Sequence, residues 1–140
     1  MAAAGPTANF TLMALAAVAI RAGISFGYFS APEQVNFTRI IEATRPETMG
    51  FAATFLSILF VLNLVLGTFN LLPVPPLDGN SVITLFMSER TALRFLDWSH
   101  SSGFGFAGLI VAWVVYGRIF DYVFLAALNL LYFGTGHSYG

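Results

Sequence analysis

An uncharged apolar run that ends in a cluster of prolines limits the fold of this chain more than any other feature. Residues 50–72 carry no charged side chain, and the string NLLPVPPLDG occupies residues 70–79. A run of about 20 apolar residues can span a bilayer as a helix. Proline has no backbone N–H to donate, so the helix must open within this string. Irregular backbone at membrane depth persists only where protein covers it or where it lines a cavity. We therefore predict a membrane-spanning helix that is broken at the proline cluster.

The composition of the chain agrees with a membrane location. The 140 residues are 57% hydrophobic and only 9% charged, whereas a soluble domain carries about 25% charged residues. The net charge of −1 provides no basic surface, so we expect no nucleic-acid partner. Cysteine is absent, which excludes disulfides and thiol chemistry. We expect an integral membrane protein surrounded by the lipid bilayer.

Three segments are apolar and long enough to span a membrane. They cover roughly residues 7–29, residues 50–88 with a break at 73–79, and residues 104–133. Polar connections join them, and the glycine-rich residues 134–140 are expected to form a flexible tail. The sequence thus predicts an all-α integral membrane helical bundle. Residues 1–140 would form a single membrane domain with about three spans and one broken helix.

Asp78 stands next to the break and has two interpretations of equal weight. A carboxylate near apolar spans is costly to bury unless a cation, a metal or a water-filled cavity stabilises it. Asp78 is either a helix-capping residue after a proline turn at the membrane interface, or part of a functional site. In the second case its carboxylate suits zinc, typically beside two histidines in hydrolytic sites. Gly79 would then allow a close approach of the backbone.

Two strings resemble motifs of one protein family. NLLPVPPLDG at residues 70–79 resembles the NxxPxPxLDG motif of the site-2 proteases, which are intramembrane zinc metalloproteases of the M50 type. AGPTAN at residues 4–9 resembles the AGPxxN element of the same family, and the order and separation of the two strings also fit. The resemblance covers essentially the whole chain, as the C-terminal two-thirds of a compact member. We place such a protein in a bacterial or archaeal cell membrane.

The resemblance implies a role for each matching residue. Asp78 would be the third zinc ligand, and Asn70 would shape the cleft near the metal. The prolines would unwind the backbone where a membrane-spanning helix of a substrate protein docks. Asn9 would approach from the neighbouring helix and stabilise an oxyanion. In this family zinc polarises the scissile carbonyl and activates a water, and the Asp78 end of the broken span faces the cytosol.

The chain departs from the family pattern at one point. The family takes its other two zinc ligands and its general base from an HExxH helix upstream of AGPxxN, and this sequence contains no HExxH. His100 and His137 are its only histidines, and their positions in a polar loop and in the tail do not suggest zinc ligands. The missing ligands would come from upstream sequence or from an HExxH-bearing partner chain. Alone, the chain is expected to be inactive.

Three hypotheses for the function follow. The chain is the C-terminal part of an intramembrane zinc metalloprotease, a non-catalytic membrane scaffold or regulatory homologue, or a small transporter or channel, where broken helices also occur. An in-frame HExxH upstream of Met1 favours the first hypothesis. Absence of stoichiometric zinc favours the second, and ion flux that depends on Asp78 favours the third.

Overall fold

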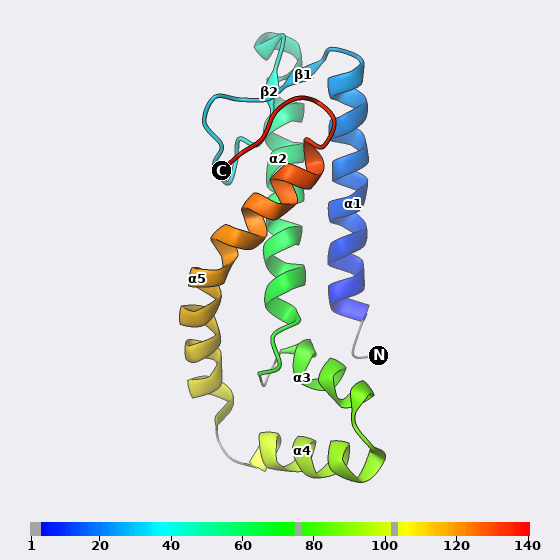
Figure 1. The fold of residues 1–140 in the computed structure, drawn as a ribbon, viewed down its shortest axis with the longest axis vertical. Helices are drawn as coiled ribbons and strands as arrows, with labels where there is room; N and C mark the ends of the chain where they lie inside the picture. Colours follow the sequence, from blue (N-terminus) through cyan, green and yellow to red (C-terminus); the bar gives the residue numbers. More distant parts are fainter. Residues whose placement is uncertain (1–3, 75–76, 102–103) are drawn as a thin grey trace. The chain divides into compact units, whose positions relative to one another are not determined.

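The computed structural model describes residues 4–74, 77–101 and 104–140, and within these ranges it does not describe the side chains of residues 98–101 and 104–106. Helices dominate the described chain (Figure 1). The elements in chain order are α1 (Ala4–Ser25), β1 (Phe29–Ser30), β2 (Glu42–Ala43), α2 (Pro46–Asn70), α3 (Asp78–Ile83), the 3-10 helix η1 (Thr84–Phe86), α4 (Glu89–Ser101) and α5 (Phe104–Leu131).

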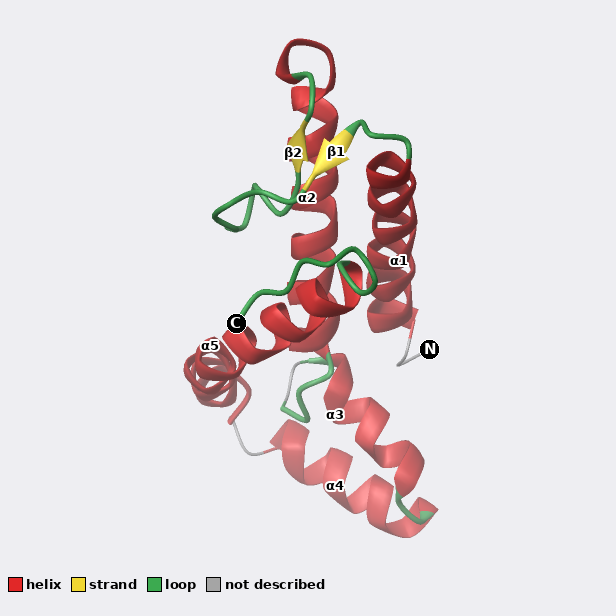
Figure 2. Cartoon of the chain, turned by 45° about the horizontal axis from the view of Figure 1, so that its top comes forward, coloured by secondary structure: helices red, strands yellow, loops and turns green. Residues whose placement is uncertain are grey.

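Three of the helices that the structure describes are long and apolar enough to cross a membrane. They are Ala4–Ser25, Pro46–Asn70 and Ala107–Leu131, the last being most of α5. The two short strands pair antiparallel, with Phe29 opposite Ala43 and Ser30 opposite Glu42. Figure 2 shows this pair in yellow beside α2. The prediction of an all-α integral membrane bundle with about three spans is confirmed.

The chain divides into two compact units. Val65–Phe120 and the N-terminal turn up to Asn9 form the first, which we call the Asp78 unit. Phe10–Leu64 and Asp121–Gly140 form the second, which we call the hairpin unit because it contains β1 and β2. That residues 1–140 act as a single membrane domain stays a prediction.

The first helix ends earlier than the apolar pattern indicates. The predicted span covers residues 7–29, whereas α1 ends at Ser25. Gly27 has a φ of 75° and terminates the helix. Its N–H donates to the carbonyl of Ile24 at 3.0 Å, and the N–H of Tyr28 donates to the carbonyl of Gly23 at 2.8 Å. This pair of bonds is a Schellman motif, which needs a left-handed residue such as glycine.

The broken helix is confirmed, although its break begins before the prolines. Helix α2 ends at Asn70, and α3 begins at Asp78. The N–H of Leu72 donates to the carbonyl of Phe69 at 3.1 Å, so the last turn of α2 is tightened. A residue that precedes proline avoids the helical conformation, and this applies to Leu72 before Pro73. Consequently Asp78 lies in the first turn of the next helix and not within the break.

The connection between α1 and α2 is more buried than its polar composition suggests. Ile40 and Ile41 are almost completely buried. The N–H of Ile40 donates to Ser57 Oγ at 3.2 Å, and the carbonyl of Ile40 accepts the Tyr132 hydroxyl at 2.6 Å. Ser57 in turn donates to the carbonyl of Ala53 at 2.8 Å. Helix α2 and the residue that follows α5 therefore hold both backbone groups of Ile40.

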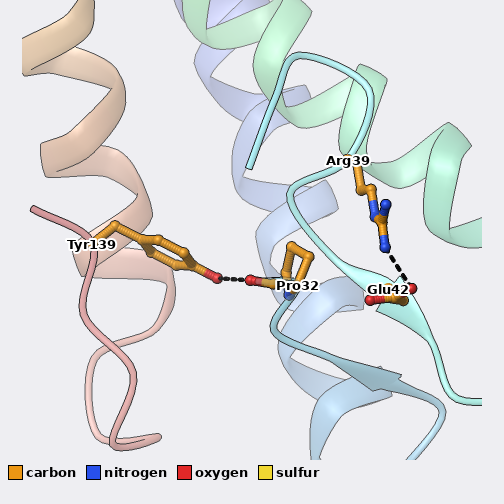
Figure 3. A network of polar contacts seen from close by, with 4 residues as sticks. All are labelled: Pro32, Arg39, Glu42 and Tyr139. Carbon is orange, nitrogen blue, oxygen red and sulfur yellow. Dashed lines mark hydrogen bonds and ion pairs between the residues drawn. The ribbon is translucent and has the colours of Figure 1, made fainter. Parts of the chain in front are cut away.

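The C-terminal residues contact this connection as well. The Asn129 amide binds the backbone of Tyr139 twice, with bonds of 2.8 and 2.9 Å. The Tyr139 hydroxyl donates to the carbonyl of Pro32 at 3.2 Å (Figure 3). That residues 134–140 are flexible concerns motion and stays a prediction. The contacts show that this segment folds back within the hairpin unit.

Candidate functional site

Asp78 is the first residue of α3 and does not cap it. The N-cap residue is Leu77, which has an extended backbone and makes no side-chain cap bond. The Asp78 side chain is half-buried. Its carboxylate has no ion pair or hydrogen bond to the residues that the structure describes. A negative charge in the first turn of a helix is favourable, so the carboxylate is stabilised there and free to accept a ligand.

Gly5 in the first turn of α1 lies against this carboxylate. A Cβ built on Gly5 would overlap Asp78 Oδ2 and would lie 3.5 Å from Asp78 Cγ. A side chain at this position would force the Asp78 carboxylate to move, so glycine permits the observed position of the carboxylate. The contact joins the strings AGPTAN and NLLPVPPLDG, which are far apart in the sequence but share the Asp78 unit.

The same geometry determines where Asn9 lies. Asn9 follows Gly5 by four residues on α1, and residues at this spacing occupy one face of a helix. Asn9 therefore lies one turn along the face of α1 that Gly5 turns toward Asp78. Its side chain is half-buried and makes no hydrogen bond to the described residues. The amide is thus available on this face.

Gly79 attaches α3 to the opened backbone. A Cβ on Gly79 would overlap the carbonyl oxygens of Leu71 and Leu72. Both oxygens belong to the segment where α2 has stopped, and Gly79 itself is buried. The LDG sequence thus places the first turn of α3 directly on the break, which fixes the position of the neighbouring Asp78.

Helix α5 holds the end of α2 that carries Asn70. The Thr68 and Tyr116 hydroxyls form a hydrogen bond of 2.5 Å. The Phe69 ring meets Trp113 and Tyr116 edge-on, with centroids 5.9 and 5.2 Å apart. Asn70 follows these two residues and is half-buried. Sequence reasoning missed this aromatic cluster, although the spacing of Trp113 and Tyr116 on one helix was a usable signal.

Other residues that the sequence singled out do not join this site. Pro73 is exposed in the turn after α2, and the next two prolines of the motif lie outside the described residues. His137 belongs to the hairpin unit, where its ring centroid lies 6.2 Å from that of Tyr132. The side chain of His100 is likewise outside what the structure describes.

The described residues do not form a zinc site by themselves. A catalytic zinc takes three protein ligands and leaves a fourth position for water or substrate. Among the side chains that the structure describes, which do not include that of His100, no group of three His, Cys, Asp or Glu is arranged to hold a metal. Asp78 has the chemistry of one ligand, because it offers a carboxylate with no protein partner in this part of the chain. One carboxylate is insufficient.

The described chain contains three helices able to span a bilayer, and one of them ends at a break with the Asp78 carboxylate beside it. These features define an integral membrane protein with a candidate site near the break. The family model of Peptidase family M50 matches residues 1–115. The chain therefore belongs to this family, that of the site-2 proteases, and the resemblance of its two strings is confirmed. Comparisons with curated proteins and with solved structures found no match.

Proposed function

We propose that this chain forms the C-terminal part of an intramembrane zinc metalloprotease. The contact between Gly5 and Asp78 carries the proposal. It joins the two strings that resemble family motifs, and it leaves a carboxylate without a partner among the described residues. Membership of Peptidase family M50 supports the same reading.

The proposal assigns Asp78 as a single zinc ligand. The other ligands and the general base would come from an HExxH segment outside these 140 residues, either in preceding sequence or in a partner chain. When bound, zinc would polarise a peptide carbonyl and activate a water. The surrounding membrane would be that of a bacterial or archaeal cell.

The remaining residues of the site would orient the substrate. Asn9, one helical turn beyond Gly5, would donate from its amide to an oxyanion, a contribution of about 3–4 kcal/mol where it has been measured for similar donors. Asn70 would shape the cleft at the end of α2. The backbone of residues 71–74 would accept an unwound stretch of a membrane-spanning substrate helix, because helix α2 has ended at Asn70.

The experiment has a genetic and a biochemical arm. Sequencing upstream of the Met1 codon, and mass spectrometry of the protein isolated from its own membranes, identify any HExxH segment or partner. The isolated protein is then tested for cleavage of membrane-spanning substrates. Asp78→Asn should abolish cleavage, whereas Asp97→Asn, an exposed position in α4, should leave it unchanged. Full cleavage by Asp78→Asn would refute the proposal.

A non-catalytic membrane scaffold is the second candidate. It is favoured by the absence of HExxH from these residues and of a three-ligand group from the described ones. It predicts that protein isolated from its own membranes contains no stoichiometric zinc and carries no HExxH partner. One-to-one zinc would exclude it.

A further inference from the structure

A cavity of about 390 Å³ lies in the hairpin unit, where α1 ends and α2 begins. It is remote in sequence from the residues assigned to the proposed protease site. We call it the Arg45 pocket. Its lining residues are Phe26, Gly27, Tyr28, Thr44, Arg45, Thr48 and Met49.

Arg45 supplies an uncompensated positive charge to this pocket. Its guanidinium makes no ion pair or hydrogen bond with the part of the chain that the structure describes. Arg39 on the same connection differs, because it pairs with Glu42 at 2.6 Å (Figure 3). The nearest acid in sequence, Glu47, does not line the pocket. The pocket therefore favours an anion.

The walls of the pocket are held in place by backbone hydrogen bonds. Gly27 is fixed by the Schellman motif at the end of α1. The N–H of Thr44 donates to the carbonyl of Tyr28 at 2.9 Å. The Arg45 carbonyl accepts the N–H of Met49 at 2.9 Å and so begins α2. A ligand would meet a preformed site, which lowers the entropic cost of binding.

The pocket lies at the level where two membrane spans end. It adjoins the last turn of Ala4–Ser25 and the first turn of Pro46–Asn70, both of which are apolar candidate spans. Phe26 and Tyr28 are 76% and 51% exposed, with ring centroids 6.4 Å apart. Exposed aromatic rings at span ends are typical of the membrane–water interface. The ligand should therefore be present at that interface.

We propose that the Arg45 pocket binds the phosphate group of a phospholipid. The Arg45 guanidinium would bind phosphate oxygens with two parallel N–H donors. The hydroxyls of Thr44 and Tyr28 would add neutral donors, whereas the Thr48 hydroxyl already donates to the Arg45 carbonyl at 3.4 Å. Phe26 would contact the glycerol and upper acyl region. Free phosphate shares the headgroup chemistry, but it lacks the apolar part that the exposed rings accommodate.

The test measures lipid binding to the full chain purified in mild detergent. Native mass spectrometry and the thermal unfolding midpoint follow titration with dioleoylphosphatidylglycerol, with phosphate-free glucosyl diacylglycerol, and with inorganic phosphate. We expect saturable binding of the phospholipid with a rise in the unfolding midpoint. Arg45→Gln should bind it about ten- to hundredfold more weakly, as expected for the loss of charged hydrogen bonds. The matched control Arg39→Gln should bind like wild type.

Each other result has a definite meaning. Equal losses in Arg45→Gln and Arg39→Gln, or equal binding of the phosphate-free lipid, would overturn the proposal. Inorganic phosphate that binds as tightly as the phospholipid would overturn the lipid assignment. If Arg45→Gln does not fold, Arg45→Lys takes its place. This variant keeps the charge but loses the paired donors, so it should weaken binding less than tenfold, and unchanged binding would contradict a role for the guanidinium.

Discussion

Gly5 makes room for the Asp78 carboxylate, and one added methyl group tests this contact. In Gly5→Ala the new Cβ overlaps Asp78 Oδ2. Asp78 Oδ2 is the far end of a flexible side chain that can rotate away, so the cost should lie at the low end of the range for overpacking, about 1 kcal/mol. We expect a lower free energy of unfolding in detergent, and a much smaller loss in the Asp78→Ala background because the carboxylate is then absent. Equal losses in both backgrounds would show that the two residues do not touch.

Gly50 provides a matched control for this substitution. It also lies in a helix, and a Cβ on Gly50 would meet no atom within 4 Å. Gly50→Ala should be neutral or stabilise the protein by about 0.5–1 kcal/mol, because alanine favours helices more than glycine does. A destabilisation as large as that of Gly5→Ala would show that the effect at Gly5 does not come from its contact with Asp78.

Tyr132 gives the hairpin unit a dependence on alkaline pH. Burial raises the pKa of the Tyr132 phenol above its ordinary value of 10.0, and the neighbouring Tyr139 adds to this. Below pH 10 the phenol is protonated in both states. Above it the unfolded chain loses the proton first, so the unfolding free energy falls by up to about 1.4 kcal/mol per pH unit. Tyr132→Phe should reduce this slope in pH-dependent unfolding, and a smaller slope should remain because burial also raises the pKa of Tyr139.

A slope in Tyr132→Phe as steep as that of the wild type would contradict the assignment to Tyr132.

At the residue scale, the sequence identified Asp78 as a candidate site residue. It did not predict that Gly5 lies against the Asp78 carboxylate. Asp78 stood out because an acid beside a proline break needs an explanation. Gly5 was visible only as part of a motif, since a missing side chain leaves no chemical signal. The sequence could not decide whether Asp78 caps α3, because the residue at which a helix begins depends on local backbone geometry. In the structure the cap residue is Leu77.

At the scale of elements, Ser57 and Tyr132 stabilise the connection between α1 and α2. Ser57→Ala leaves the buried N–H of Ile40 without its acceptor. An unsatisfied buried donor costs about 1–3 kcal/mol. We expect faster hydrogen exchange of the Ile40 amide by about ten- to hundredfold if exchange follows local opening, measured by mass spectrometry on peptides that cover this connection.

Thr54→Ala is a suitable comparison. Thr54 lies on the same helix as Ser57 and is exposed. It makes no hydrogen bond to Ile40. Its removal should leave exchange of the Ile40 amide unchanged. Unchanged exchange in Ser57→Ala would mean that the serine does not hold the connection.

The helices were predictable to different degrees. Long apolar runs define α2 and α5, because a bilayer requires internally satisfied backbone over about 20 residues. The end of α1 was not predictable from apolarity, since Phe26 and Tyr28 continue the hydrophobic pattern beyond the glycine turn. The strands β1 and β2 were missed because two residues are too few for an alternating pattern.

At the scale of the whole molecule, membership of Peptidase family M50 and the three apolar helices define an integral membrane protein of a protease family. The sequence predicted this class, since low charge and two motifs are properties of composition and order. A complete ligand set could not be predicted from these residues, because neither the sequence nor the described structure brings three ligands together. The central claim is therefore that Asp78 completes a zinc site whose other ligands lie elsewhere.

Zinc content tests this claim most directly. The protein is purified from its own membranes with any HExxH-bearing segment or partner, and zinc is measured by inductively coupled plasma mass spectrometry. We predict about one zinc per copy in wild type, its loss in Asp78→Ala, and its retention in Asp97→Ala. Wild-type protein without zinc, or full zinc in Asp78→Ala, would contradict the account.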